Sequence, residues 1–402
     1  TAPYIITRNT ASIFHNMTKG ADDPSLRNRK KGKGKSSSPK KDNTKDEVEE
    51  KVEVSTPQST ETKNENADAV ATTETSSTTN SSKFTFSSLF ENRGPGKGDI
   101  WSDIILLLYL YFAVIHISAA LVNHIDDTDE TYGYWEPLHY LLFKEGMQTW
   151  EYSPHYAIRS YAFIYPLYLI GKGLQLIGLH KLRIFYFLRL LIGLFTATGE
   201  VSFISAITRR YSNLILSFFV TFFLICSPGV YFASTSFLPS AIASSLIMHC
   251  VSCWIQMKFH WAIFWGSLAV LWTGWPFVGL LLLPIGIHMI TTIVLKRQKR
   301  NPAVSETIIA LVQFIVTSLM VVFFVFIPSL VLDVQSYGKW TSPTLNIAMY
   351  NVFNGSGDNL YGIEPVSYYI KNLFLNLGLA WPVALAWPLI AIVNKLSHKQ
   401  DS

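Results

Sequence analysis

Residues 104–122 read IILLLYLYFAVIHISAALV, a long and almost purely apolar run. A helix rises about 1.5 Å per residue and needs about 20 such residues to cross the hydrocarbon core of a bilayer. We therefore predict a first membrane span at about residues 101–122. Further apolar segments lie near residues 161–178, 184–207, 213–227, 237–256, 260–273, 275–294, 304–332 and 373–394. Together they predict an all-α, polytopic integral membrane protein.

The charged residues are unevenly distributed along the chain. Asp, Glu, Lys and Arg make up only 15% of the 402 residues, and many of them lie in residues 1–97, beside numerous Ser, Thr and Asn. That stretch has too few apolar side chains to offset the entropy lost on ordering. Residues 1–97 are therefore predicted to be a disordered cytosolic tail, and residues 98–402 the membrane domain.

Short basic clusters at residues 27–35, 296–300 and 395–399 supply much of the net charge of +5. Beside apolar spans, such clusters are typical of the cytosolic side of a membrane rather than of a nucleic-acid surface. We therefore expect the lipid bilayer as a partner and no nucleic acid.

The basic clusters also predict a topology. With a cytosolic N-terminus, the first loop, at about residues 123–160, is lumenal. An odd number of crossings must then separate it from the cytosolic cluster at 296–300, yet six apolar segments lie between them. Gly274 and Pro276 interrupt one of these stretches, so residues 260–294 are predicted to form a single broken crossing.

This scheme has eight crossings and a second lumenal loop at about residues 333–371. It also places Arg209 and Arg210 in the lumen, against the tendency of basic residues to lie in the cytosol. The orientation of the loop at residues 208–212 therefore stays open.

Four acids, Asp126, Asp127, Asp129 and Glu130, follow the first span within five residues. Carboxylates this close repel one another, so they require a cation, hydrogen-bond donors or plain water. A solvated loop is the simplest explanation. The adjacent span and the aromatic residues that follow favour a functional site, because aromatic rings suit both sugar faces and membrane interfaces.

Motifs of other protein classes are missing from the sequence. It contains no P-loop, no GxGxxG after a strand, no HExxH and no GxSxG. Cys250 and Cys253 form a CxxC, but they lie with Cys226 in apolar segments and are interpreted as buried apolar residues. A transporter usually needs acids inside the membrane, and Glu200 is almost the only one here.

The acids open a longer run that resembles a known family. Residues 127–166 read DTDETYGYWEPLHYLLFKEGMQTWEYSPHYAIRSYAFIYP. The run resembles the first lumenal loop of the dolichol-phosphate-mannose-dependent mannosyltransferases, which are C-type glycosyltransferases. It is most similar to the branch that forms α-1,2 linkages in asparagine-linked glycosylation.

The second loop is similar to the same family. Asp333, the run from Tyr337 to Lys339, Asn346 and Glu364 before Pro365 resemble its later lumenal motif. A Glu at this place resembles the α-1,2 branch, whereas sister enzymes of the glycolipid-anchor pathway more often have His-Pro. Family members usually continue into further spans, so the chain is expected to be truncated at its C-terminus.

The resemblance implies a C-type glycosyltransferase bundle in the endoplasmic-reticulum membrane, with a lumenal active site. The implied donor is dolichyl β-D-mannosyl phosphate, and the implied acceptor is the dolichol-diphosphate-linked oligosaccharide. An α product from a β donor requires inversion, which needs one base to take the proton of the acceptor hydroxyl. Asp129 is expected to be this base, and Glu130 to orient Asp129 or the acceptor. Asp127 is the second candidate for the base.

The leaving phosphate needs a cation rather than a metal or another cofactor. Candidates are Arg159, His155 and Lys339, although Arg159 could instead be an interfacial arginine whose charge snorkels to water. Asn354 heads a glycosylation sequon in the second loop. Further substrate-binding residues are expected at Trp135, Glu136, Tyr337 and Glu364.

Two further functions stay open. A sister enzyme of the GPI-anchor or α-1,6 branch would share the donor and the loop chemistry. A truncated chain would instead be a non-catalytic membrane partner.

Overall fold

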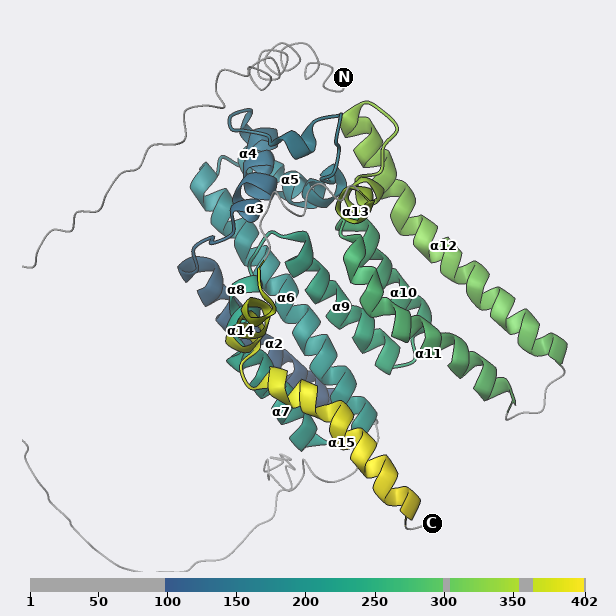
Figure 1. Ribbon diagram of the computed structural model, residues 1–402. Coiled ribbons are helices and arrows are strands. Elements are labelled where there is room, and N and C mark those ends of the chain that lie inside the picture. Colours follow the sequence, from purple (N-terminus) through teal and green to yellow (C-terminus); the bar gives the residue numbers. More distant parts are fainter. Residues whose placement is uncertain (1–97, 299–303, 354–363, 401–402) are drawn as a thin grey trace, which may run out of the picture. The chain divides into compact units, whose positions relative to one another are not determined.

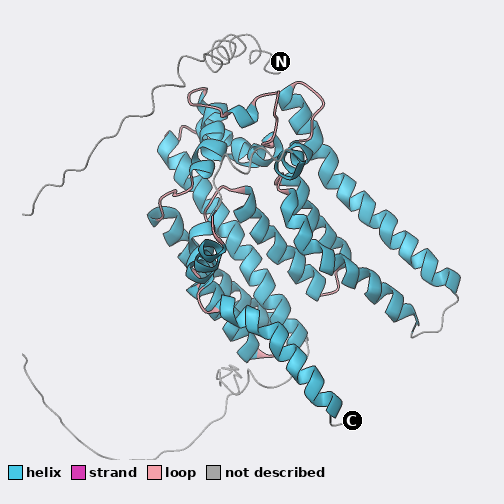
Figure 2. Ribbon diagram, viewed as in Figure 1, coloured by secondary structure: helices cyan, strands magenta, loops and turns pink. Residues whose placement is uncertain are grey.

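The computed structural model describes residues 98–298, 304–353 and 364–400. The tail at residues 1–97, predicted to be disordered, and the sequon at Asn354 lie outside these residues. Within the described ranges every regular element is a helix and none is a strand (Figure 1; Figure 2). This confirms the predicted all-α class.

The elements follow one another along the chain with short connections. They are α2 Gly98–Val122, α3 Thr128–Glu130, the π-helical turn η3 Thr131–Trp135, α4 Glu136–Phe143, η4 Trp150–Tyr152, α5 Tyr161–Leu176, α6 Lys181–Tyr211, α7 Leu214–Cys226, α8 Pro228–Ala233, α9 Pro239–Ile255, α10 Phe259–Ser267, η5 Leu268–Trp272, η6 Pro276–Val278, α11 Gly279–Gln298, α12 Val304–Tyr337, α13 Pro343–Phe353, α14 Val366–Leu377 and α15 Ala380–Gln400.

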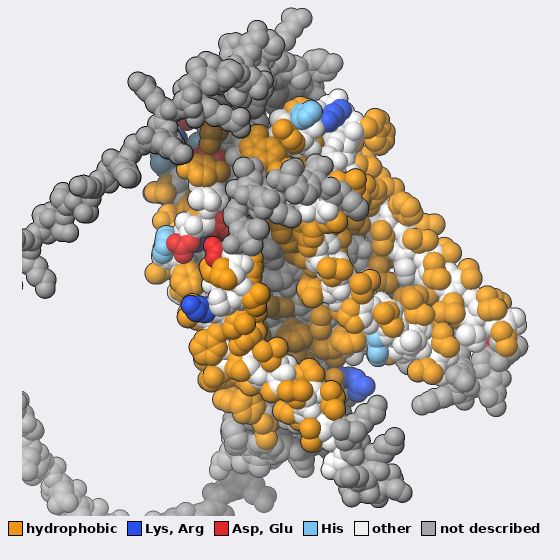
Figure 3. Space-filling model, in the orientation of Figure 1, with side chains coloured by type: hydrophobic (Ala, Val, Ile, Leu, Met, Phe, Trp, Pro, Cys, Tyr) orange, Lys and Arg blue, Asp and Glu red, His pale blue; other side chains and the backbone are white. Residues whose placement is uncertain are grey.

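Four of the described helices are long and apolar enough to cross a membrane: Ser102–Val122, Lys181–Tyr211, Pro276–Leu295 and Val304–Tyr337. The pair α14 and α15, bent by 106°, makes a fifth if it counts as one span. Apolar side chains cover much of the exposed helix surface, which suits contact with lipid (Figure 3). Three shorter apolar helices, α7, α9 and α10 with η5, complete the bundle.

Contacts between helices fix their directions. We call the end of the bundle that holds residues 123–160 the loop end. There Arg189 of α6 donates a hydrogen bond of 2.8 Å to the carbonyl of Asn123, just after α2. Farther along, His116 of α2 lies 2.6 Å from Glu200 of α6, so these two helices are antiparallel. Helix α6 therefore runs from the loop end to the opposite end.

Helix α5 stays at the loop end, contrary to the prediction of a span at residues 161–178. At its start the amide of Ala162 donates to Asp333, near the end of α12. Near its other end Gly171 lies so close to Leu142 and Ile184 that a Cβ would come within 2.9 Å of Leu142. In Figure 1, α5 lies with α3 and α4. Its 16 residues are fewer than the roughly 20 that a span needs.

The prediction that residues 260–294 form one broken crossing was also wrong. At the start of α11, a Cβ on Gly279 would touch Val270, which follows α10. Farther along α11, His288 accepts a 3.0 Å hydrogen bond from Trp254, which is near the end of α9 and hence near the start of α10. Helices α10 and α11 are therefore antiparallel neighbours on either side of the turn at Thr273. Gly274 in this turn has a φ of +69°, which glycine adopts without strain.

These two corrections resolve the conflict at Arg209 and Arg210. Because α5 does not cross, both arginines lie in the last turn of α6, at the opposite end from residues 123–160. The start of α2, the connection between α9 and α10 and the end of α11 share that end (Figure 1). Arg209 and Arg210 thus no longer oppose the positive-inside rule, although exposed Lys144, Lys181 and Lys339 lie at the loop end. The number of crossings stays a prediction.

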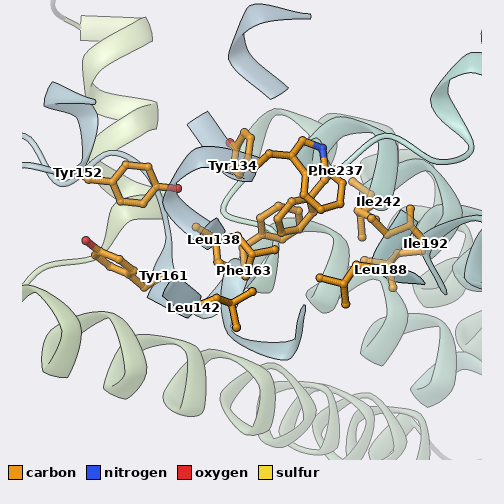
Figure 4. Packing of buried hydrophobic residues seen from close by; sticks show 14 of the residues in the cluster. Tyr134, Leu138, Leu142, Tyr152, Tyr161, Phe163, Leu188, Ile192, Phe237 and Ile242 are labelled. Atoms are coloured by element: carbon orange, nitrogen blue, oxygen red, sulfur yellow. The ribbon is translucent and has the colours of Figure 1, made fainter. Parts of the chain in front are cut away.

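The region predicted as a first polar loop is largely helical and supplies core residues. Tyr134, Leu138 and Leu142 pack with Phe163 and Phe237, as Figure 4 shows. The rings of Phe163 and Phe237 stack with centroids 5.1 Å apart. This core fixes the backbone that carries the acids. The described residues of the region predicted as a second loop are also mostly helical, since they include the end of α12, all of α13 and the start of α14.

Candidate active site

The acids begin a continuous helical rod formed by α3, η3 and α4. Asp127 caps its start, accepting a 2.7 Å hydrogen bond from the amide of Asp129. The π turn then brings side chains five residues apart together, so that Trp135 Nε1 donates to Glu130 Oε1 at 2.8 Å. Such turns occur often at functional sites. The rod places Asp129 and Glu130 in different environments.

Glu130 points into the protein and is only 5% exposed. Besides Trp135, its carboxylate accepts hydrogen bonds from the hydroxyl of Ser236 and from the amide of Phe237, the latter at 2.9 Å. These three donors satisfy a buried charge that would otherwise be costly. The geometry supports a role in anchoring the rod to the segment before α9, rather than contact with the acceptor.

Arg159 lies at the centre of the site, with its side chain only 8% exposed. Its Nε and Nη2 donate to the two oxygens of Glu151, at 3.0 and 2.8 Å, and Nη1 donates to the hydroxyl of Tyr134 at 2.6 Å. Nη2 also lies 3.4 Å from Asp129 Oδ2. The guanidinium is therefore bound by protein groups, and the structure gives no support to the predicted contact with the donor phosphate.

The ionisation of this cluster follows from burial and charge. Burial raises the pKa of Tyr134 to about 12, although the neighbouring Arg159 lowers it. Burial alone would lower the pKa of Arg159, but Tyr134 and Glu151 raise it above its ordinary value. The arginine therefore stays cationic and the tyrosine neutral at physiological pH. Asp129 is the outermost member, with 68% of its side chain exposed.

Residues from the second predicted loop hold the backbone around Arg159. The hydroxyl of Tyr337 donates to the carbonyl of Arg159 at 2.6 Å. Asp333, which is buried, accepts hydrogen bonds from the hydroxyl of Ser160 and, at 3.0 Å, from the amide of Ala162. These contacts join parts of the chain more than 170 residues apart. Tyr337, predicted to bind substrate, is buried and fixes this segment through its hydroxyl, and its contact with substrate stays a prediction.

The other predicted site residues lie around this cluster. Trp135 is buried between Phe185 and Phe237 rather than on an open surface. Glu136 is half-buried and accepts a 3.3 Å hydrogen bond from the amide of Met147. His155, Lys339 and Glu364 are exposed. Among the described residues no group of three or more His, Cys, Asp or Glu side chains could hold a metal ion.

The sequence interpretation did not single out four residues that complete the site. Glu151 is eight residues from Arg159, and its acidic side chain was a detectable signal. Asp333 belongs to the run that resembles the family's later lumenal motif, but the sequence predicted no function for it. Ser236 and Phe237 carry no signal in the sequence, because only the fold brings them to Glu130.

Replacing Asp333 by Ala should destabilise the protein by about 1–3 kcal/mol, because the buried amide of Ala162 would lose its acceptor. Asp333→Asn is the matched control. It keeps one carbonyl oxygen for that amide and should cost less. Thermal unfolding of the purified protein measures both variants, and equal midpoints for Asp333→Ala and the unmodified protein would contradict the role of Asp333.

A helical membrane bundle with a carboxylate and a buried arginine at one end is compatible with a membrane glycosyltransferase. The chain belongs to the Alg9-like mannosyltransferase family, whose model matches residues 107–400. It is 35% identical over 314 residues to alpha-1,2-mannosyltransferase ALG9 of Homo sapiens, covering 77% of this chain and 48% of that protein.

Two other relatives show the range of similarity. Alpha-1,2-mannosyltransferase algn-9 of Caenorhabditis elegans is 38% identical over 291 residues, covering 71% of this chain and 45% of that protein. GPI alpha-1,2-mannosyltransferase 3 of Homo sapiens is 24% identical over 332 residues, covering 76% and 55%. The chain spans about half the length of the curated relatives it matches. No solved structure matches the chain.

Proposed function

We propose that this protein transfers mannose from dolichyl β-D-mannosyl phosphate to the dolichol-diphosphate-linked oligosaccharide, forming α-1,2 linkages during assembly of the N-glycan precursor. One structural observation carries the proposal: the exposed carboxylate of Asp129 lies at the edge of a buried, fully bonded arginine. The relatives named as alpha-1,2-mannosyltransferases support mannose transfer and the linkage, and membership of the Alg9-like family implies the donor and the acceptor.

In the proposed reaction Asp129 is the general base. Its carboxylate takes the proton of the acceptor hydroxyl while the hydroxyl oxygen attacks the anomeric carbon. The bond from that carbon to the phosphate oxygen breaks, and dolichyl phosphate leaves with the electron pair, so the configuration inverts. Arg159 fixes Asp129 Oδ2, while Oδ1 has no hydrogen-bond partner among the described residues and can face the acceptor.

Glu151 has a distinct part in this arrangement. It holds Arg159 by two short charge-assisted hydrogen bonds, whereas Asp129 has only one longer contact. The arginine is thus largely neutralised by Glu151 and orients Asp129 without taking up its whole carboxylate. For the leaving phosphate, the exposed Lys339 and His155 stay as candidate cations, with Glu364 as a candidate contact to the sugar hydroxyls.

The proposed site of action is the endoplasmic-reticulum membrane, with the loop end in the lumen. The placement of Arg209 and Arg210 in the last turn of α6, opposite the loop end, supports this orientation. A glycosylation sequon introduced near Gly146 should therefore be modified, and one introduced between Arg210 and Ser212 should not. A gel shift after glycosidase treatment measures both. Glycosylation of the sequon between Arg210 and Ser212 would show that this end, and not the loop end, faces the lumen.

Cells that lack this protein should accumulate a shortened dolichol-linked mannose oligosaccharide, while their glycolipid anchors stay intact. Mass spectrometry of the lipid-linked oligosaccharides and a count of anchored surface proteins measure the two outcomes. The second candidate function is that of a sister enzyme of the glycolipid-anchor branch. The similarity to the human GPI alpha-1,2-mannosyltransferase 3 favours it. Loss of anchors with normal oligosaccharide would favour that candidate.

A further inference from the structure

The two predicted loops meet in a group of aromatic rings that the proposed mechanism does not use. Trp150 of η4 packs edge to face on Tyr156, with ring centroids 4.8 Å apart. On another side it contacts Tyr350 of α13, with centroids 5.9 Å apart. Trp150 is 37% and Tyr156 44% exposed, and Tyr350 is half-buried. We call these three residues the aromatic cluster.

The cluster is held in place by polar contacts between the same two segments. The side-chain amide of Asn346 donates to the carbonyls of Tyr156 and Ala157, at 3.2 and 3.0 Å. Asn346 lies one helical turn before Tyr350, so both side chains lie on the same face of α13. The rings are therefore arranged before any ligand arrives, which lowers the entropy lost on binding.

The cluster is next in the sequence to a residue that holds Arg159. Trp150 precedes Glu151, whose carboxylate binds Arg159, and Arg159 in turn contacts Asp129. Polar groups border the rings, since Thr149 bonds Glu151 and the exposed His155 packs on Tyr156. Partly exposed rings with polar neighbours suit a sugar, which has an apolar C–H face and hydroxyl groups around its edge.

We propose that the aromatic cluster binds mannosyl residues of the acceptor oligosaccharide, adjacent to the residue that receives the new mannose. This inference rests on the proposed function. A dolichyl chain is a poorer fit, because it needs the apolar helix surface inside the bilayer, whereas Tyr156 packs against the exposed His155 and its carbonyl binds the side chain of Asn346. A belt of interfacial aromatic residues is the competing explanation.

Substitution of Trp150 or Tyr350 by Ala should raise the KM for a synthetic lipid-linked acceptor by about tenfold, the effect of losing roughly one stacked ring. The KM for dolichyl-phosphate-mannose and kcat should stay within about twofold of the unmodified protein. Trp150→Phe keeps a ring and should recover part of the loss. Trp340→Ala is the matched control: Trp340 is 85% exposed and contacts no other ring among the described residues.

An unchanged acceptor KM, an equal rise of both KM values, or the same effect from Trp340→Ala would overturn the proposal, the last two in favour of an interfacial belt or a general structural role. A second measurement needs no turnover: saturation-transfer NMR of a lipid-free α-linked mannotriose with the purified protein. Its signal should fall in Trp150→Ala and persist in Trp340→Ala. If this holds while the protein transfers no mannose, the proposed function fails and the glycan site stands. If the protein transfers mannose but Trp150→Ala leaves the signal intact, the glycan site fails alone.

Discussion

Asp129→Asn should lower turnover by about two to four orders of magnitude, because the amide keeps the shape of the side chain but cannot take the acceptor proton. The side chain is 68% exposed, and within the described part of the chain its one polar contact is with Arg159, so folding and membrane insertion should change little. Donor binding should also be preserved, since in the proposed reaction Asp129 contacts the acceptor hydroxyl rather than the lipid or the phosphate of the donor. A microsomal assay with dolichyl-phosphate-mannose and a synthetic lipid-linked acceptor measures the effect.

Asp127→Asn is the matched control for Asp129→Asn. Asp127 caps the rod through the amide of Asp129, and Asn is an equally good capping residue. Asp127→Asn should therefore lower turnover much less than Asp129→Asn does. Near-normal turnover in Asp129→Asn together with a collapse in Asp127→Asn would transfer the role of base to Asp127. Normal turnover in both would show that neither carboxylate is the base.

Arg159→Leu should destabilise the protein by about 3–5 kcal/mol, because it leaves the largely buried carboxylate of Glu151 without its cation. The hydroxyl of Tyr134 would lose a 2.6 Å hydrogen bond in the same step. Activity should be lost as well, since Asp129 would lose its orienting contact. Thermal unfolding of the purified protein measures the stability, and the microsomal assay measures the activity.

Two companion variants separate charge from geometry at Arg159. Arg159→Lys keeps the charge but cannot bind both oxygens of Glu151 and also Tyr134. Its stability should therefore lie between that of Arg159→Leu and that of the unmodified protein. Adding Glu151→Gln to Arg159→Leu removes the unpaired charge and should recover part of the lost stability. Strictly additive losses in the double variant would contradict the pairing of Arg159 with Glu151.

The fold class was predictable because the length and composition of a membrane span are properties of a single segment. The crossing pattern was not, because the apolar stretch at residues 161–178 resembles a span in the sequence, whereas α5 has only 16 residues and its contacts keep it at one end. Its start is tied to Asp333 and its end lies against Ile184. No local pattern in residues 161–178 encodes these tertiary contacts. The basic residues at 209 and 210 were the one signal that disagreed with the predicted scheme.

The candidate site was partly predictable for a similar reason. Asp129 and Arg159 belong to one run of sequence, and the structure brings them within 3.4 Å. The burial of Glu130 was not foreseeable, because its partner Ser236 is 106 residues away. Likewise, the sequence predicts that Tyr337 contacts substrate, whereas in the structure its hydroxyl donates a hydrogen bond to the carbonyl of Arg159.

The most direct test of the proposed function is transfer of labelled mannose from dolichyl-phosphate-mannose to a purified lipid-linked oligosaccharide by the purified protein. The product should gain mannose, and an α-1,2-specific mannosidase should release the label. The Asp129→Asn variant, analysed beside it, should give no product above background. Label that resists the α-1,2-specific enzyme would contradict the proposed linkage. No transfer by the unmodified, folded protein with both substrates present would contradict the proposed activity itself.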